Sequence, residues 1–322
     1  MKISVIIPVF NENRIIEELI DRTTKALNEI SSSYEIIIVD DGSSDGSLQQ
    51  LIKYTKLNNR IKIIVLSRNF GHQHAYTAGL KYASGDYVAM IDGDLQDPPE
   101  LLPEMYSKLI SENNDIISGK RTSRKGNIIR NCIISSFHSF FKKAVQLKGL
   151  KDTGNFCIMN RQALNALLSM KEKTRYLPGM RNYIGFKQDY VEYIREKRFK
   201  GKSKMNTVKL CLLAADAIFS FSRLPIRLCF FIGFFGAFIS LIAGAYALYV
   251  KIAGVALKGW SSTVMSIYFI GSIQLIFLGI IGEYIYRIYK ESQKRPLYFI
   301  KKIYDQEKSE STVTINNKIS EN

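Results

Sequence analysis

Two long stretches without a charged residue lie in the last third of the chain, from Leu228 to Val250 and from Gly259 to Gly282. At about 1.5 Å of rise per residue, a helix over either stretch is longer than a hydrocarbon core of about 30 Å. A soluble helix of this length normally keeps a polar face, so a pair of buried core helices is the weaker interpretation. We therefore predict two membrane-spanning helices, at about 228–250 and 262–284, within a region from 226 to 288.

The positive charges around these stretches predict their orientation. Arg223 and Arg227 precede the first stretch, and four more arginine and lysine residues follow the second between positions 287 and 295. The connection between the two stretches carries only Lys251 and Lys258. Because positively charged loops stay on the cytoplasmic side of a membrane, we expect both ends of the chain in the cytoplasm.

The first 120 residues alternate short apolar runs with amphipathic ones, which predicts parallel strands joined by helices. The expected strands are Ile3–Val9, Glu35–Val39, Ile61–Leu66 and Tyr87–Ile91, and the expected helices are Ile15–Ile30 and Ser47–Lys56. Each strand is followed at once by polar residues. In an open parallel sheet ligands bind at the carboxyl ends of the strands, so these polar residues are the first candidates for function.

The sequence Asp92-Gly93-Asp94 follows the last of these strands. Two carboxylates separated by a glycine can face one hard divalent cation, and the glycine lets the backbone approach a diphosphate. Taken alone, the pattern is more typical of a solvated turn. Its context favours a site, because Asp40 and Asp41 follow another strand, where carboxylates can accept hydrogen bonds from a base and a ribose.

Apolar residues recur at helical spacing between Thr207 and Phe221, with few charges among them. This pattern predicts a juxtamembrane helix over 206–225 that lies on the membrane surface, with an ordinary surface helix as the alternative. The chain after about Ile303 is polar and poor in aromatic residues, so we expect no regular structure there, within a tail at 289–322.

Six stretches of the chain together resemble a known family. They read IIPVFNE, IIIVDDGSSDGS, LSRNFGHQHAYTAGL, ASGDYVAMIDGDLQDPPE, DIISGKR and RFKGKSK. In this order, followed by a juxtamembrane segment and two apolar stretches, they resemble the inverting GT-A glycosyltransferases of the dolichol-phosphate mannosyltransferase type, which include bacterial polyprenyl-phosphate glycosyltransferases. The resemblance covers roughly residues 3 to 290.

The resemblance implies an α/β fold of the GT-A type, with a Rossmann-like, mostly parallel sheet, over residues 1–205. It implies inverting transfer of a sugar from a UDP- or GDP-linked donor to polyprenyl (undecaprenyl) phosphate at the cytoplasmic face of a membrane. The implied cofactor is Mg²⁺ or Mn²⁺. We expect a multi-pass protein of a bacterial plasma membrane (inner membrane) with a cytoplasmic catalytic domain, and a homo-oligomer is compatible with the resemblance.

The resemblance also implies roles for particular residues. Those expected to bind the donor are Pro8, Phe10, Glu12, Asp40, Asp41, Asp92 and Gly93. Those expected to hold the metal are Asp92, Asp94 and Gln96. Those expected to receive the acceptor phosphate are Arg121, Arg130 and Ser203. Those expected to act in catalysis are Asp94, Arg198 and Lys204, the last two on a loop that closes over both substrates. The alternative is that these basic residues form an ordinary solvated surface, as lysine and arginine runs usually do.

One segment departs from the family pattern, and two histidines need a separate interpretation. Where many relatives read GDFRL, this chain has Gly154-Asn155-Phe156-Cys157-Ile158, which lacks an acid and an arginine, so Asn155 cannot act as a base. His72 and His74 could supply two metal ligands in the loop after the third strand. With no third ligand evident, we favour a donor-loop or structural role for them.

The basic middle of the chain allows alternative functions. Residues 115–209 carry 22 Lys and Arg against 6 Asp and Glu, a surface that nucleic acid, anionic lipid or a phosphorylated substrate could meet. A membrane-tethered module that binds nucleic acid or lipid would explain this charge but not the acidic strand ends, which would repel a phosphate backbone, so we expect no nucleic-acid partner. A processive polysaccharide synthase is the nearest alternative, but the single tryptophan, Trp260, follows a glycine, so the QxxRW element of such enzymes is missing.

Overall fold

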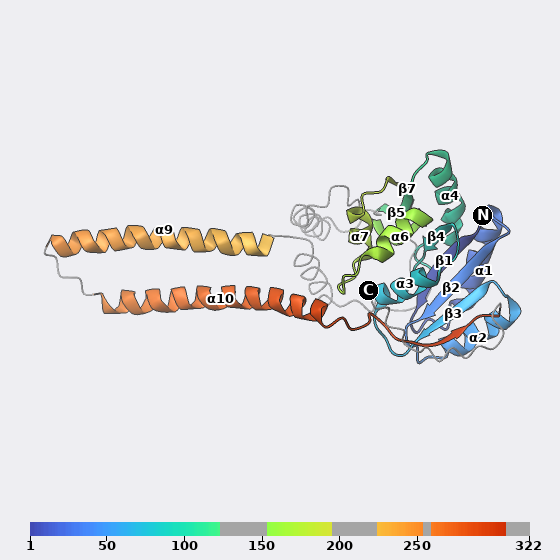
Figure 1. Ribbon diagram of the computed structural model, residues 1–322, viewed down its shortest axis with the longest axis horizontal. Helices are drawn as coiled ribbons and strands as arrows, with labels where there is room; N and C mark the ends of the chain where they lie inside the picture. The colour runs from blue at the N-terminus through green and yellow to red at the C-terminus, as the bar shows by residue number, and fades with distance from the viewer. Residues whose placement is uncertain (123–152, 195–223, 254–258, 307–322) are drawn as a thin grey trace. The chain divides into compact units, whose positions relative to one another are not determined.

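The computed structural model describes residues 1–122, 153–194, 224–253 and 259–306 (Figure 1). The chain divides into two compact units. The first contains residues 1–135, 147–204 and 295–322, and the second contains 136–146 and 205–294. The first unit is therefore formed by segments from both ends of the chain.

Within the described residues, the first unit contains an eight-stranded sheet with the order β7-β5-β6-β4-β1-β2-β3-β8. Its strands are β1 (Ile3–Val9), β2 (Tyr34–Asp40), β3 (Ile61–Leu66), β4 (Tyr87–Met90), β5 (Ile116–Thr122), β6 (Thr153–Asn160), β7 (Gln188–Ile194) and β8 (Ile300–Tyr304). Strands β1 to β4 are parallel, and so are β5 and β7. β6 runs antiparallel between β4 and β5, and β8 runs antiparallel to β3. The mostly parallel α/β sheet implied by the resemblance is present.

Helices cover both faces of this sheet (Figure 1). One face carries α1 (Ile16–Ile30), α2 (Ser47–Leu57), η1 (Pro99–Leu101) and α4 (Leu102–Ser111), and the other carries α3 (His72–Tyr82), α6 (Arg161–Ser169) and α7 (Leu177–Tyr183). Successive strand residues point to opposite faces, so Ile3, Val5 and Ile7 pack with α1 and α4 while Ile6 faces α3. Gly79 allows α3 to approach β1 closely, because a Cβ there would collide with the Ile6 side chain.

The four strands and two helices expected from the sequence are confirmed, each within one residue at either end. The sequence did not indicate α3, and the expectation that His72 and His74 lie in a loop is wrong, since both lie in its first turn. It also did not indicate β5 to β8. These strands mix apolar residues with glycine or charged residues, so their pattern is weaker than the continuous Val/Ile runs of buried parallel strands.

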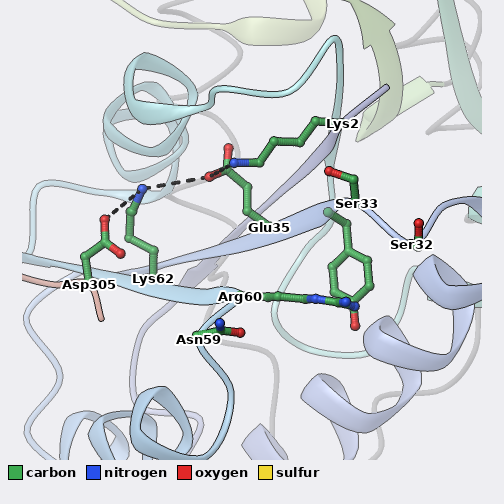
Figure 2. Close-up of a pocket in the computed structure, with 9 residues that line it drawn as sticks. Lys2, Ser32, Ser33, Glu35, Asn59, Arg60, Lys62 and Asp305 are labelled. Carbon is green, nitrogen blue, oxygen red and sulfur yellow. Dashed lines mark ion pairs between the residues drawn. The ribbon is translucent and has the colours of Figure 1, made fainter. Parts of the chain in front are cut away.

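Strand β8 overturns part of the expectation for the end of the chain. The absence of regular structure expected from about Ile303 is wrong for Tyr304, which ends β8 and pairs with Ile63 of β3. Asp305 continues this attachment through an ion pair of 3.0 Å with Lys62 (Figure 2). Residues 307–322 lie outside the described part of the chain.

The second unit contains two long helices, α9 (Leu224–Ile252) and α10 (Trp260–Ser292). Gly233 of α9 faces Phe277 of α10, since a Cβ added at the glycine would lie 3.5 Å from the ring. Among the described residues one segment, Phe269–Ser292, is long and apolar enough to cross a membrane, so the prediction of two membrane-spanning helices is not confirmed. The expected juxtamembrane helix at 206–225 falls almost entirely outside the described residues.

A buried carboxylate joins several strands at the amino-terminal edge of the sheet, where one pocket is lined by charged residues (Figure 2). The Glu35 side chain is 8% exposed and accepts hydrogen bonds from the Ser4 hydroxyl at 2.6 Å and from the Ser84 backbone and hydroxyl at 2.7 and 2.8 Å. The ammonium groups of Lys2 and Lys62 lie 3.3 and 3.8 Å away. Burial alone raises the pKa of Glu35, but the hydrogen bonds from Ser4 and Ser84 and the charge of Lys2 outweigh it, so the pKa lies below its ordinary value.

We predict that Glu35→Gln destabilises the protein by about 1–3 kcal/mol at pH 7, because an amide cannot replace a carboxylate that accepts several hydrogen bonds. A depressed folded-state pKa gives stability above the ordinary value of 4.5 that is lost as pH falls through the lower, folded-state value. The difference in the free energy of unfolding between variant and wild type should therefore be smaller at pH values below about 4 than at pH 7. Denaturant unfolding at several pH values measures it, with the exposed Glu104→Gln as control. Equal stability of Glu35→Gln and wild type at pH 7 would contradict the prediction.

Candidate active site

Three loops meet at the carboxyl-terminal edge of the sheet, after β1, β2 and β4. Parallel pairing places them together, because Val9 at the end of β1 is in register with Asp40 at the end of β2. Gly93 in the loop after β4 lies against β1, and a Cβ there would be 2.5 Å from the Pro8 carbonyl oxygen. Only glycine fits this approach, so Asp92 and Asp94 are held beside the end of β1.

Hydrogen bonds between backbone and side chains join the first two loops. The backbone N–H groups of Asn11 and Glu12 donate to the hydroxyls of Ser43 and Ser47, each at 3.0 Å. The Asn11 side-chain oxygen in turn accepts from the Ser44 N–H at 2.8 Å. Asn11 has a φ of 55°, a left-handed conformation that asparagine tolerates better than most residues. The loop containing Phe10 and Glu12 is thus fixed against the loop after β2.

Asp40 and Asp41 are 1% and 3% exposed, and both carboxylates bind backbone N–H groups. Asp41 accepts from Phe70 at 2.7 Å and from Gly71 at 3.0 Å, and Asp40 accepts from Ser43 at 3.3 Å. Burial raises the pKa of both groups, and these hydrogen bonds oppose the increase. Asp41 therefore fixes the loop between β3 and α3 in place.

Asp92 is the centre of a charged cluster that draws on three elements. Its Oδ1 atom accepts a hydrogen bond of 2.8 Å from the Tyr76 hydroxyl and lies 3.2 Å from His72 Nε2, while Oδ2 lies 3.9 Å from Arg121 Nη2. Burial alone would raise the pKa of Asp92, but His72, Tyr76 and Arg121 hold it well below its usual range. Asp92 is therefore ionised and already surrounded by donors.

Arg121, at the end of β5, is oriented by two buried residues, Asp97 and Tyr193. Its Nη2 atom lies 3.4 Å from the carboxylate of Asp97, which is fully buried, and its Nε donates to the Tyr193 hydroxyl at 3.1 Å. The Tyr193 hydroxyl also donates to Asp97. The Arg121 side chain remains 30% exposed. Gly154 makes room for it, since a Cβ there would lie 2.7 Å from Nη2.

Asp94 and Gln96 share one turn, in which the Gln96 N–H donates to Asp94 Oδ1 at 3.2 Å. Both are partly buried, and Leu95 between them has a φ of 57° and points inward. Among the described residues no group of three His, Cys, Asp or Glu side chains is arranged to hold a metal ion. Mg²⁺ does not need such a cage, because it is normally bound by one or two carboxylates together with substrate phosphates and water. Asp94 and Asp92 fit this simpler kind of site.

Several residues of this cluster were not singled out by sequence reasoning. Gln73 donates to the Asn155 side-chain oxygen at 3.2 Å, and the Asn155 amide lies 3.4 Å from His72 Nδ1, which connects α3 to β6. Arg181 of α7 is 1% exposed and donates to the carbonyl oxygens of Gly154 and Asn155. Asp97 lies inside a quoted motif, but nothing in the sequence distinguishes its buried carboxylate from those of Asp92 and Asp94.

The structure thus brings together Pro8, Phe10, Glu12, Asp40, Asp41, Asp92, Gly93, Asp94, Gln96 and Arg121 at one edge of the sheet. The remaining predicted site residues, Arg130, Arg198, Ser203 and Lys204, lie outside the described residues. His72 contacts Asp92, and His74 bonds through Nδ1 to the Phe70 carbonyl oxygen at 2.9 Å. Of these two histidines, His72 is therefore the one that contacts the acidic cluster in the described part of the chain.

Comparison with known proteins decides the family. Residues 4–168 match the model of glycosyl transferase family 2. An uncharacterized glycosyltransferase of Synechocystis sp. is 40% identical over 309 residues, which cover 94% of this chain and 96% of the relative. The chain belongs to glycosyl transferase family 2. The resemblance found from its motifs is therefore confirmed.

Two further relatives of this family 2 glycosyltransferase have more specific names. The prophage bactoprenol glucosyl transferase homolog of Escherichia coli (strain K12) is 36% identical and covers 94% of this chain and 99% of its own length. The bactoprenol glucosyl transferase of Shigella phage SfV is 36% identical, with 94% and 98% covered. Among solved structures, glucosyl-3-phosphoglycerate synthase from Mycobacterium tuberculosis in complex with UDP is 17% identical, with a TM-score of 0.48 and 68% and 78% covered.

Proposed function

We propose that this family 2 glycosyltransferase moves a sugar from a UDP- or GDP-linked donor to a polyprenyl phosphate, with inversion at the anomeric carbon. One observation carries the proposal: a partly exposed guanidinium, Arg121, lies 3.9 Å from Asp92 in the acidic loop. A group that binds an anion and a loop suited to a metal-bound diphosphate are therefore adjacent. The full-length similarity to bactoprenol glucosyl transferases supports a polyprenyl phosphate as acceptor.

The reaction needs positioning more than it needs a strong base. The second pKa of a phosphate monoester is about 6, so near neutral pH the acceptor is largely a dianion and a sufficient nucleophile. One of its oxygens forms a bond to the anomeric carbon while the bond from that carbon to the diphosphate breaks. The nucleoside diphosphate leaves with the electron pair. Asn155 has an uncharged amide, which fits a mechanism without a carboxylate base at that position.

Arg121 is suited to bind the phosphate of the acceptor. Asp97 and Tyr193 orient the guanidinium from the buried side, so little conformational freedom is lost when its exposed edge binds. A guanidinium can donate two parallel hydrogen bonds to a phosphate, which brings the acceptor beside the donor despite their like charges. By resemblance, Arg130 and Ser203 would complete the acceptor site, and Arg198 and Lys204 would close over both substrates.

The acidic loop is suited to a divalent cation. Asp94 would hold it directly, and Gln96 would add an amide oxygen. Asp92 would join by exchanging one of its present donors, His72 or Tyr76. Bound Mg²⁺ or Mn²⁺ would neutralise the charge that develops on the leaving diphosphate. On the donor side, Asp40 and the loop containing Phe10 and Glu12 would bind the nucleoside.

We further propose that α9 and α10 both span a bacterial plasma membrane, with the catalytic unit in the cytoplasm. The 29 residues of α9 include only two charged ones, Arg227 and Lys251, near its ends. All charged residues of the 33-residue α10 follow Gly282. Large apolar side chains such as Phe234, Leu241 and Leu275 are exposed on these helices, and a lipid environment would cover them.

The first prediction from this proposal tests the reaction. Wild-type protein in detergent, given undecaprenyl phosphate, Mg²⁺ or Mn²⁺ and a panel of radiolabelled UDP and GDP sugars, should form a labelled lipid from one donor. Asp94→Ala should lower the rate at least about 100-fold, because it removes a metal ligand. Glu104→Ala, an exposed carboxylate on α4, should not change it. Labelled polymer in place of lipid would support a processive polysaccharide synthase and contradict the acceptor assignment.

A second prediction concerns the acceptor site. Arg121→Lys keeps the charge but cannot form the bidentate contact, so the KM for polyprenyl phosphate should rise about tenfold, equivalent to about 1.4 kcal/mol. The neighbouring Lys120 pairs with Glu192 at 2.5 Å, and Lys120→Ala should leave this KM unchanged. Steady-state kinetics with each substrate varied in turn gives the comparison. A rise confined to the donor KM would place Arg121 at the donor.

A third prediction concerns the membrane. If both helices span it with the catalytic unit inside, a cysteine at Lys258→Cys should react with an impermeant maleimide on intact cells, because it lies between the spans. A cysteine at Glu291→Cys should react only after permeabilisation. Labelling is compared with that of the unmodified chain, which has four cysteines. Protection of both positions in intact cells would exclude this topology.

A further inference from the structure

The chain that follows α10 returns to the sheet beside the donor side of the site. The Phe299 carbonyl oxygen, just before β8, accepts a hydrogen bond of 2.9 Å from the Ser67 N–H, just after β3. The ring of Phe299 lies 6.2 Å from the ring of Phe70, centroid to centroid. Burial, with Tyr82 of α3 nearby, raises the pKa of Tyr298 to about 12. The residues before β8 are thus packed against the β3–α3 region.

Ser67 and Phe70 belong to the loop of residues 67–71, here called the β3–α3 loop. Its Phe70 and Gly71 N–H groups bind the two oxygens of Asp41. It also passes close to Gly42, where a Cβ would lie 2.7 Å from the Arg68 carbonyl carbon. The loop therefore sets the position of the segment just after Asp40.

The same loop determines where α3 begins. Gly71, with a φ of 96°, precedes the helix, and His72 in the first turn lies 3.2 Å from Asp92. A shift of the loop would move Asp41 and His72 together. Asp41 is itself one of the predicted donor-binding residues, and His72 contacts another, Asp92.

Asp41 and Gly42 contact one side of the loop, while its other side is exposed. Ser67, Arg68 and Asn69 are exposed, and the Arg68 guanidinium lies over the Phe70 ring at 4.2 Å. Phe299 packs on this ring from the position just before β8, and β8 is attached independently, by pairing with β3 and by the ion pair of Asp305 with Lys62. Phe299 is itself 45% exposed, so it lies at the rim of the fold and not in its core.

We propose that Phe299 is a positioning residue for the donor site: it holds the β3–α3 loop through Ser67 and Phe70, and thereby Asp41 and His72. This inference rests on the proposed function for its link to the sugar donor. Its structural part, the control of loop conformation by Phe299, can be tested without any substrate.

The test uses the full-length protein in detergent with three variants. Phe299→Ala removes the ring contact, Phe299→Tyr preserves it, and Lys301→Ala changes an exposed residue two positions further along the same segment. Hydrogen exchange without substrate should be about tenfold faster at the Phe70 and Gly71 amides in Phe299→Ala, with β1 and β2 unchanged. In the transfer assay its donor KM should rise about three- to tenfold, while kcat and the acceptor KM change less than about twofold. Phe299→Tyr and Lys301→Ala should behave like wild type.

Unchanged exchange in the β3–α3 loop of Phe299→Ala overturns the proposal, whatever the reaction is. Faster exchange spread through β1 and β2 also overturns it, because Phe299 would then support the whole sheet. Faster hydrogen exchange in the loop together with an unchanged donor KM overturns it as well. Failure of the proposed function is recognised separately, since wild type would then form no labelled lipid; binding of UDP and GDP, measured by calorimetry, would replace the donor KM.

Discussion

The parallel pairing of β1 with β2 and β4 determines where everything else in the site can lie. Because these strands run in one direction, their carboxyl ends meet at one edge, and the register sets Val9 opposite Asp40. The strands are buried on both faces, which fixes their register through packing and not through the loops. The loops can therefore carry carboxylates and strained conformations without loss of the fold.

The collection of acidic residues at this edge raises an electrostatic problem that the fold solves locally. Asp92 and Asp97 are separated by only four residues and both lie largely out of water, where uncompensated charge is costly. Arg121 lies between them, and Tyr76, His72 and Tyr193 donate to their oxygens. The Arg121 guanidinium stabilises these carboxylates and is also the group proposed to bind the acceptor phosphate. Stability and function therefore depend on the same residue.

Sequence reasoning succeeded where one local physical cause dominates. The continuous apolar runs of β1 to β3 have few alternatives to a buried strand, and the polar residues after them identify the edge. It failed where the contacts of a side chain depend on residues that are distant in the sequence. His72 appeared as one of two histidines in a loop, and its contact with Asp92 depends on α3 beginning at that residue. Asp97 is buried because Tyr193 and Arg121, distant in sequence, surround it.

The attachment of β8 to β3 has a consequence for biosynthesis. About 230 residues, including both long helices, separate the two strands in the chain. At about 5–20 residues per second, a ribosome needs roughly 10 to 50 s to make the stretch between them. During this time β3 is an open edge of the nascent sheet, and such edges promote association with other chains. Closing the sheet is thus a late event in the production of this protein, and a fragment ending before α9 would keep the β3 edge open permanently.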